Sequence, residues 1–326
     1  MNFNPYAFPL SPKEYAPRPV PSLEEWRQLW SVWDLVTTKM IPSDALMEQP
    51  IPLRNPLLFY LGHIPAFEDI HLNRATNKTP TEPAYYHKIF ERGIDPDVDD
   101  PSKCHDQSEL PDIFPPLSEI LEYRDRVKFR IKHLYETGQA HSNRCVGRAL
   151  WIGFEHEGLH AETFLFVTIQ SPSILPPPGL PKPDLAKIAK EAASRRLDNQ
   201  WFTIPSQTCA IGFHDPESDR GPDRFFAWDN EREPYDVHVP EFQSQARPVS
   251  NGEYAAYLID TKQPGFKPMK IYPGYSADFM DGKHTAVVGG SWALHPRISG
   301  RKSFLNWWQK KYLWPWVTFR LVRDVK

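Results

Sequence analysis

The chain has 326 residues, a formal net charge of -3, 40% hydrophobic residues and 35 prolines. This length suits two domains or one large one, and the near-neutral charge gives no reason to expect nucleic acid or an anionic membrane as a partner. Cys104, Cys145 and Cys209 are far apart and odd in number, which argues against a disulfide framework and for a reducing, cytoplasmic location. We expect no signal peptide and no membrane span, because no basic start precedes an apolar run and no apolar run approaches ~20 residues.

The first part of the chain predicts an extended arm and two helices. Residues 1–21 are rich in Pro and Tyr and predict the arm. Ser22 and Glu25 then form a capping-box pattern, and tryptophans recur behind them at helical spacing. Residues 55–76 predict a second helix, which Pro65 would kink or divide because proline lacks an N–H and clashes with the preceding turn.

Two longer helices are predicted further along, over residues 115–138 and 142–171. A long connection rich in Asp and Pro precedes them, with a short helix expected around residues 82–91. Four helices of this length, two of them joined by a long crossover, predict a helical bundle over residues 1–171.

Beyond the bundle, residues 172–199 predict a proline linker followed by a polar helix. From Trp201 the chain changes to short β-prone runs separated by Gly, Pro and Asp turns. Strands are expected within residues 201–213, 234–250, 284–294 and 317–324. The sequence therefore predicts an α+β protein whose second domain, residues 200–326, is irregular.

The stretch "WIGFEHEGLHAETFLFV" in the fourth predicted helix contains H-E-x-x-H, the pattern of one class of zinc peptidase. His156 and His160 lie one turn apart and can direct two imidazoles at one ion. A peptidase needs a third ligand downstream, and neither the extended H-x-x-G-x-x-H form nor a later ligand-bearing helix follows. Glu162 is no substitute, because it lies ~200° around the helix from His160.

A better third ligand lies upstream, at His63 on the second predicted helix. Metal sites in bundles are built from inward side chains of facing helices. Three imidazoles with open coordination positions suit Fe(II) and also catalytic zinc, so spacing alone leaves the metal open. His71 competes with His63 for this role, and Glu157 is expected as an outer-shell or surface carboxylate rather than a general base.

Several long blocks resemble one enzyme family. They are "GHIPAFEDIHL", "RCVGRALWIGFEHEGLHAET", "GPDRFFAWDNEREPYDVHVPEFQSQARPVSNGEY", "YPGYSADFMDGKH" and "GGSWALHPRISGRKSFLNWW", and they resemble the sulfoxide synthase part of fungal ergothioneine biosynthesis enzymes. The resemblance implies a DinB-like four-helix bundle followed by a mixed α/β domain similar to formylglycine-generating enzyme, which is C-type-lectin-like. It also implies a non-heme Fe(2+) enzyme that joins the sulfur of cysteine to the imidazole of hercynine (Nα-trimethylhistidine) with O2 and forms a sulfoxide.

The same resemblance implies roles for individual residues. His63, His156 and His160 match the iron ligands of the family. The family also places a proton-donating tyrosine just before a Pro-Gly-aromatic turn, and "IYPGYSADF" makes Tyr272 the match, with Tyr275 close by.

Substrate contacts follow from the chemistry of hercynine. A trimethylammonium group favours an aromatic cage, and a carboxylate favours a bidentate arginine. The cage candidates are Trp292, Trp307 and Trp308, and the carboxylate candidates are Arg297 and Arg301. Core tryptophans and solvated surface arginines are the structural alternatives.

Two departures from the family leave the function open. No Gly-rich nucleotide-binding turn follows a strand, so we expect no methyltransferase domain and another source of hercynine. The short "TKQPGF" stands where the family has a large segment, so we expect a shortened second domain. The alternatives are a thiol oxygenase or an enzyme for another histidine derivative, a non-catalytic relic or partner of a full-length enzyme and, as a minor one, a zinc metallopeptidase. The oligomeric state is also open.

Overall fold

In the computed structural model of the chain, the described residues are 20–51, 54–91, 110–215, 226–231, 233–249 and 279–325 without 281, 283, 302 and 310–317. The chain divides into two compact units. The first comprises residues 1–178, 215–226 and 290–301, and the second comprises residues 179–214, 227–289 and 302–326. Within the described ranges, no helix combines the length and the apolarity needed to cross a membrane.

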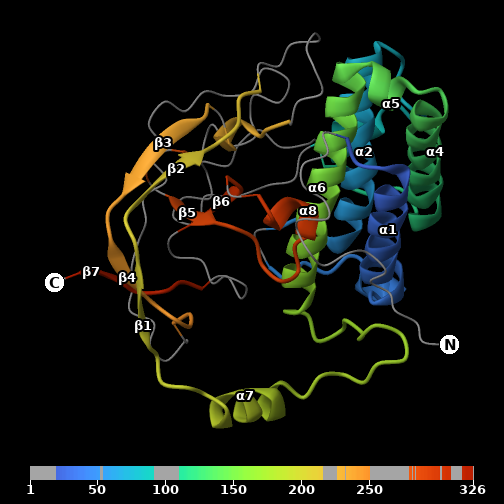
Figure 1. Cartoon of the computed structure of the whole chain (residues 1–326). Helices are drawn as coiled ribbons and strands as arrows, with labels where there is room; N and C mark the ends of the chain where they lie inside the picture. Colours follow the sequence, from blue (N-terminus) through green and yellow to red (C-terminus); the bar gives the residue numbers. More distant parts are fainter. Residues whose placement is uncertain are drawn as a thin grey trace. The chain divides into compact units, whose positions relative to one another are not determined.

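The first unit is helical (Figure 1). Its long helices are α1 (Leu23–Asp34), α2 (Leu57–Thr76), α4 (Leu117–Glu136) and α6 (Arg144–Thr168). Its short helices are η2 (Leu35–Lys39), η3 (Ser43–Ala45), α3 (Tyr86–Phe90), α5 (Gln139–Ser142) and α8 (Pro296–Ser299). Helix α2 packs against both α4 and α6, and α1 packs against α6. The predicted bundle of four long helices is therefore confirmed.

Helix α1 forms where the capping box predicts it. The Glu25 N–H donates to Ser22 Oγ at 3.2 Å, and the Ser22 N–H donates to Glu25 Oε2 at 2.7 Å, so two otherwise unpaired donors are satisfied. Behind the cap, Trp26, Trp30 and Trp33 are all buried at helical spacing. This stripe places α1 against the rest of the bundle.

Helix α2 is continuous through Pro65, so the predicted alternative in which Pro65 divides the helix is wrong. A proline in a helix interior costs ~3 kcal/mol or more. The helix is buried at every position from Leu57 to Leu72, and we attribute its continuity to this packing. It ends at Asn77, whose left-handed backbone (φ 51°) terminates the helix.

Two segments distant in sequence complete the first unit by contacts to α6. Asp215 is fully buried and pairs with Arg148 near the start of the helix. Arg301 pairs with Glu155 through both carboxylate oxygens, with 2.8 Å between Nη2 and Oε2. Because these ion pairs are buried, residues far beyond the bundle contribute to its interior.

The second unit holds short antiparallel strands. They are β1 (Trp201–Ile204), β2 (Gln207–Ile211), β3 (Tyr235–Val239), β4 (Phe242–Gln245), β5 (His284–Val288), β6 (Leu305–Gln309) and β7 (Val322–Asp324). They form one sheet in the order β1-β4-β7 and the two-stranded pairs β2-β3 and β5-β6. The predicted mixed helix and strand content after the bundle is confirmed. Strand β6, which pairs Trp307 with Ala286, was not predicted.

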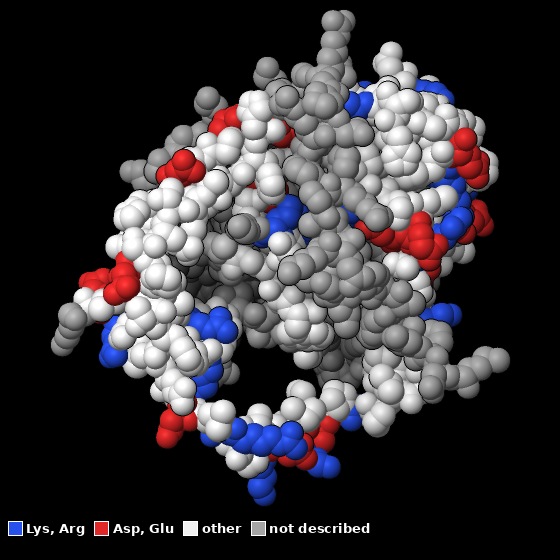
Figure 2. Space-filling model, in the orientation of Figure 1, with Lys and Arg blue, Asp and Glu red and all other residues white. Residues whose placement is uncertain are grey.

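The polar helix expected after the proline linker is α7 (Leu185–Ser194). All its residues are exposed. Most of them are Lys, Glu, Ser or Ala, and only Leu185 and Ile188 are larger apolar residues. In Figure 2, Lys and Arg side chains gather along α7 beside acidic ones, and charges of both signs are scattered over the visible face.

Candidate metal centre

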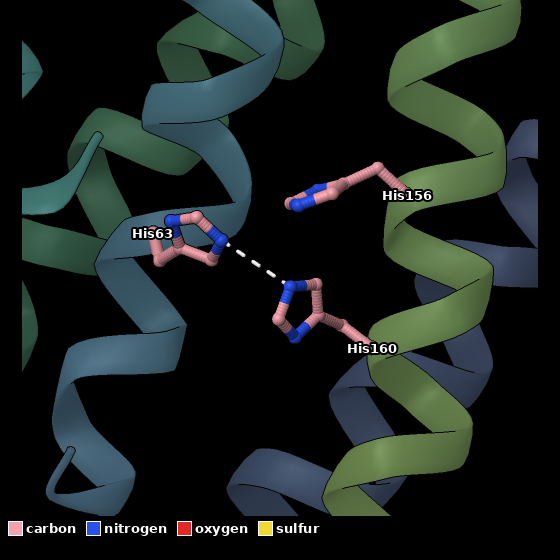
Figure 3. A group of neighbouring side chains, drawn as sticks. All are labelled: His63, His156 and His160. Atoms are coloured by element: carbon pink, nitrogen blue, oxygen red, sulfur yellow. Dashed lines mark hydrogen bonds between the residues drawn. The ribbon is translucent and has the colours of Figure 1, made fainter. Parts of the chain in front are cut away.

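The three histidines singled out in the sequence converge inside the first unit. His63 comes from α2, and His156 and His160 come from neighbouring turns of α6 (Figure 3). One nitrogen of each ring lies within 4.8 Å of the others. His63 and His156 are 3% and 7% exposed and His160 is half-buried, so the cluster lies within the unit rather than on its surface.

The spacing of the nitrogens fits a shared metal ion. His63 Nε2 and His160 Nε2 are 3.2 Å apart. Two nitrogens bound to one ion at ~2.1 Å and separated by ~90–109° lie ~3.0–3.4 Å from each other. Three imidazoles on two helices leave further coordination positions open for ligands that are not protein side chains.

The orientation of His63 is set by a second hydrogen bond. Its Nδ1 lies 2.7 Å from the carbonyl oxygen of Phe90, at the end of α3, and therefore carries the proton that it donates there. This leaves Nε2 unprotonated in the neutral ring and directed at the cluster, as in most metal-binding histidines. The ring of Phe67 stacks on His156 at 3.6 Å between centroids and 12° between planes.

Burial keeps the three imidazoles neutral. Removal from water lowers the pKa of His63 from 6.5 to about 4, although the Phe90 carbonyl opposes the shift. Burial, followed by the neighbouring imidazoles, lowers the pKa of His156 well below its usual value. Burial and His63 do the same for His160. Neutral imidazole is the form that binds a metal, so the residues fit the group that the resemblance implies.

Glu157 does not face the cluster, although it lies between its residues in the H-E-x-x-H pattern. It is 1% exposed, so it is not a surface carboxylate, and its Oε1 lies 3.7 Å from Arg124 Nη2 on α4. It also hydrogen-bonds Glu68 on α2. Burial, and then Glu157, raises the pKa of Glu68 well above its usual value, which makes Glu68 the protonated partner.

The two candidate arginines both bind carboxylates of the bundle. Arg297 Nη1 donates to Glu25 Oε1 at 3.1 Å, and Arg301 binds Glu155 as described above. Both belong to the segment 290–301 that completes the first unit. Their contribution to a substrate site stays a prediction, and so does that of Tyr272, which lies outside the described residues.

The three candidate tryptophans are not brought together on one element. Trp292 belongs to the segment 290–301 and is 77% exposed. Trp307 and Trp308 are neighbours on β6 in the second unit, and Trp307 stacks on Phe279 at 4.7 Å. Because successive side chains of a strand point to opposite faces, only one of these two could face a given ligand.

Comparisons with known proteins cover the part of the chain that holds the three histidines. The DinB superfamily matches residues 9–164, which include all three histidines. A protein of Neurospora crassa named "Ergothioneine biosynthesis protein 1" is 32% identical over 520 residues, covering 98% of this chain and 59% of that protein. A protein of the same name from Schizosaccharomyces pombe is 27% identical over 446 residues, covering 94% of this chain and 56% of that protein.

The chain thus spans less than three fifths of the length of the curated relatives it matches. The alignment with the Neurospora protein extends over 520 residues and the chain has 326, so at least 194 positions of that relative face gaps. Such gaps agree with the expectation that the chain is a shortened form.

Proposed function

Because this chain is similar over almost its whole length to two fungal proteins named ergothioneine biosynthesis protein 1, we propose that it acts in ergothioneine biosynthesis. The specific reaction that we propose is that of a non-heme iron sulfoxide synthase. It would join the thiol of cysteine to the imidazole ring of hercynine with O2.

The observation that carries this proposal is the cluster of His63, His156 and His160. These are the residues that the resemblance assigns to iron, and their buried, neutral imidazoles and 3.2 Å spacing suit a divalent ion. When bound, Fe(II) would supply open positions at which a thiolate and O2 can meet. Zinc would offer no redox chemistry at the same ligands.

The proposed reaction balances without an external reductant. The thiol loses its hydrogen, the imidazole carbon loses its hydrogen, and a C–S bond forms between them. One oxygen atom of O2 stays on sulfur as the sulfoxide, and the other leaves as water with the two hydrogens. O2 therefore accepts all four electrons that the coupling and the sulfur oxidation release.

The chain's own residues would hold and shield this site. The Phe90 carbonyl fixes the His63 ring through Nδ1. The rings of Phe59 and Phe67 stack on His63 and His156, with Phe59 lying 5.4 Å from His63 between centroids. These apolar faces keep water away from the ligands, which protects a reactive oxygen-binding site from side reactions. The candidate proton donor remains Tyr272.

A thiol oxygenase is the second candidate, and the 194 or more positions without a counterpart favour it. The histidine cluster needs only the first unit, whereas recognition of hercynine was predicted to need the C-terminal region. A zinc peptidase of the H-E-x-x-H class would use Glu157 as its general base. This function is disfavoured, because Glu157 pairs with Glu68 and Arg124 away from the three histidines.

The test is mass spectrometry of the products from protein loaded anaerobically with Fe(II) and then given hercynine, cysteine and O2. The sulfoxide synthase reaction predicts one new species, the coupled sulfoxide. Its mass equals the sum of the two substrates less two hydrogens and plus one oxygen. Cysteine sulfinate alone would support the thiol oxygenase. Bound iron without any O2-dependent product would refute both enzymatic proposals and favour a non-catalytic partner.

Two histidine variants test the site independently of turnover. His63→Ala removes a proposed ligand and should reduce bound iron by more than about tenfold. His71→Ala is the matched control, because His71 is equally buried on the same helix but lies outside the cluster. Unchanged iron content in His63→Ala would contradict the ligand assignment.

A further inference from the structure

The hydrogen-bond acceptor of His63 Nδ1 lies outside α2 and α6, the two helices that carry the metal ligands. Phe90 follows His63 by 27 residues, and its backbone carbonyl accepts the 2.7 Å hydrogen bond. The chain leaves α2 at Asn77 and reaches Phe90 at the end of α3. We call residues 77–91 the strap. Its position decides where the acceptor for His63 lies.

Gly62 contacts the C-terminal end of the strap and leaves room for it. The ring of Phe90 lies directly over this glycine, and a Cβ added to Gly62 would come within 2.5 Å of Phe90 Cζ. Phe90 is fully buried, with Tyr86 at 5.1 Å and Phe59 at 5.8 Å between ring centroids. Any side chain at position 62 would therefore displace the ring, and the carbonyl of the same residue with it.

Asp69 holds the strap nearer its start. Its carboxylate accepts from the backbone N–H of Thr81 at 2.8 Å, from Thr81 Oγ1 at 2.6 Å and from His87 Nε2 at 2.7 Å. Arg130 on α4 donates to the same group at 2.7 Å. Burial would raise the pKa of Asp69, but these hydrogen bonds outweigh it and lower the pKa, so the group stays a carboxylate at neutral pH.

We propose that Gly62 and Asp69 are positioning residues for the metal centre, acting through the strap and the Phe90 carbonyl on the ring of His63. Helix α2 thus carries the ligand His63 and also Gly62 and Asp69, the two residues that hold the strap in place. The inference rests on the proposed function, because it needs a metal at the three histidines. It goes beyond that function by assigning a role to residues that touch no ligand and no substrate.

The test compares substitutions at two crowded glycines, of which Gly62 has the closer neighbour, at 2.5 Å against 2.9 Å. Gly62→Ala displaces Phe90, whereas Gly147→Ala places a Cβ 2.9 Å from Val20 Cγ2, far along α6 from the cluster. The dissociation constant of Co(II), measured by competition in full-length protein, should rise about 10–100-fold in Gly62→Ala, the usual cost of losing an outer hydrogen bond to a metal ligand. Gly147→Ala should leave the dissociation constant unchanged even where it lowers thermal stability.

Imidazole NMR of the metal-free protein gives a readout that does not depend on binding. The His63 Nδ1–H signal should be shielded from exchange in the wild type and in Gly147→Ala. It should broaden or move in Gly62→Ala, because its acceptor has shifted. Asp69→Asn tests the other residue that holds the strap and keeps the size and shape of the side chain. It should weaken Co(II) binding less than Asp69→Ala does, since the amide oxygen still accepts from Thr81.

The outcomes separate this proposal from the metal site itself. Wild-type Co(II) affinity and an unmoved His63 signal in Gly62→Ala would overturn the role of the strap. If Gly62→Ala does not fold, the Asp69 pair decides, and equal wild-type affinity in both Asp69 variants overturns the proposal. If His63→Ala also keeps its Co(II), the metal site has failed rather than the strap.

Discussion

Removing Asp215 should destabilise the helical unit strongly, because it would leave a buried arginine without its carboxylate partner. The Asp215 side chain is fully buried and pairs with Arg148, which is 4% exposed, and with Arg144 at 3.1 Å. In Asp215→Ala the Arg148 guanidinium stays in the interior without this carboxylate, and it cannot lose its proton to escape the penalty. Breaking a buried pair in this way costs ~3–5 kcal/mol.

The assay is equilibrium unfolding in urea of the metal-free protein, followed by tryptophan fluorescence. Asp215→Ala should lower the free energy of unfolding by ~3–5 kcal/mol. The double variant Asp215→Ala/Arg148→Met should recover part of the loss, since no charge is then left buried. Glu24→Ala is the control: Glu24 and Arg27 form an exposed pair at 3.4 Å, and its loss should cost less than ~1 kcal/mol.

A loss below ~1 kcal/mol for Asp215→Ala would refute the reasoning, because the pair would then behave as a surface salt bridge. So would simple additivity of the Asp215 and Arg148 substitutions, since a directly interacting pair must show coupling. Either result would mean that residue 215 does not belong to the interior of the first unit.

Four further predictions follow from individual contacts. Arg301→Gln should lower stability through the loss of its pair with Glu155, measured by thermal unfolding, whereas a change in KM for hercynine at unchanged stability would favour the predicted substrate role. Ser22→Ala should cost ~1 kcal/mol and lower the melting temperature, seen by circular dichroism, because it removes the cap of α1. Burial lowers the pKa of His295 from 6.5 to about 4, so its contribution to stability is complete above pH 6.5 and is lost as the pH falls towards 4. His295→Asn, which keeps a capping side chain, should remove ~3 kcal/mol of that pH dependence in acid-unfolding curves, and an unchanged slope would contradict it. Co(II) at 100 times its dissociation constant should raise the free energy of unfolding by ~2.7 kcal/mol, and His156→Ala should abolish the effect in thermal scans.

Local patterns carried most of the helical prediction. The capping box at Ser22 and the tryptophan spacing behind it are interactions between residues close in sequence, so they can be found without a structure. The resemblance to ergothioneine biosynthesis enzymes is confirmed by the relatives. The spacing of His156 and His160 predicted that these two rings share one face of a helix, and the resemblance, rather than spacing, assigned His63 over His71 as their partner. The structure brings these three rings together.

Other features could not be predicted because they depend on long-range contacts. The acceptor for His63 is a backbone carbonyl, which any residue carries, so Phe90 has no sequence signature for this role. Arg301 was predicted from substrate chemistry, and only the fold shows that a carboxylate 146 residues earlier binds it. Strand β6 was not predicted, because its five residues, LNWWQ, lack the strict apolar–polar alternation that indicates a strand.

The pairing of α6 with two late segments has a consequence for synthesis on the ribosome. Arg301 is made 133 residues after α6 ends at Thr168, an interval of about 7–27 s at ~5–20 residues per second. Glu155 lacks its final partner throughout this interval, whereas Arg148 lacks its partner only for the 47 residues between Thr168 and Asp215. We expect these charges to keep the unfinished bundle from aggregating, which an apolar seam of the same size would not do.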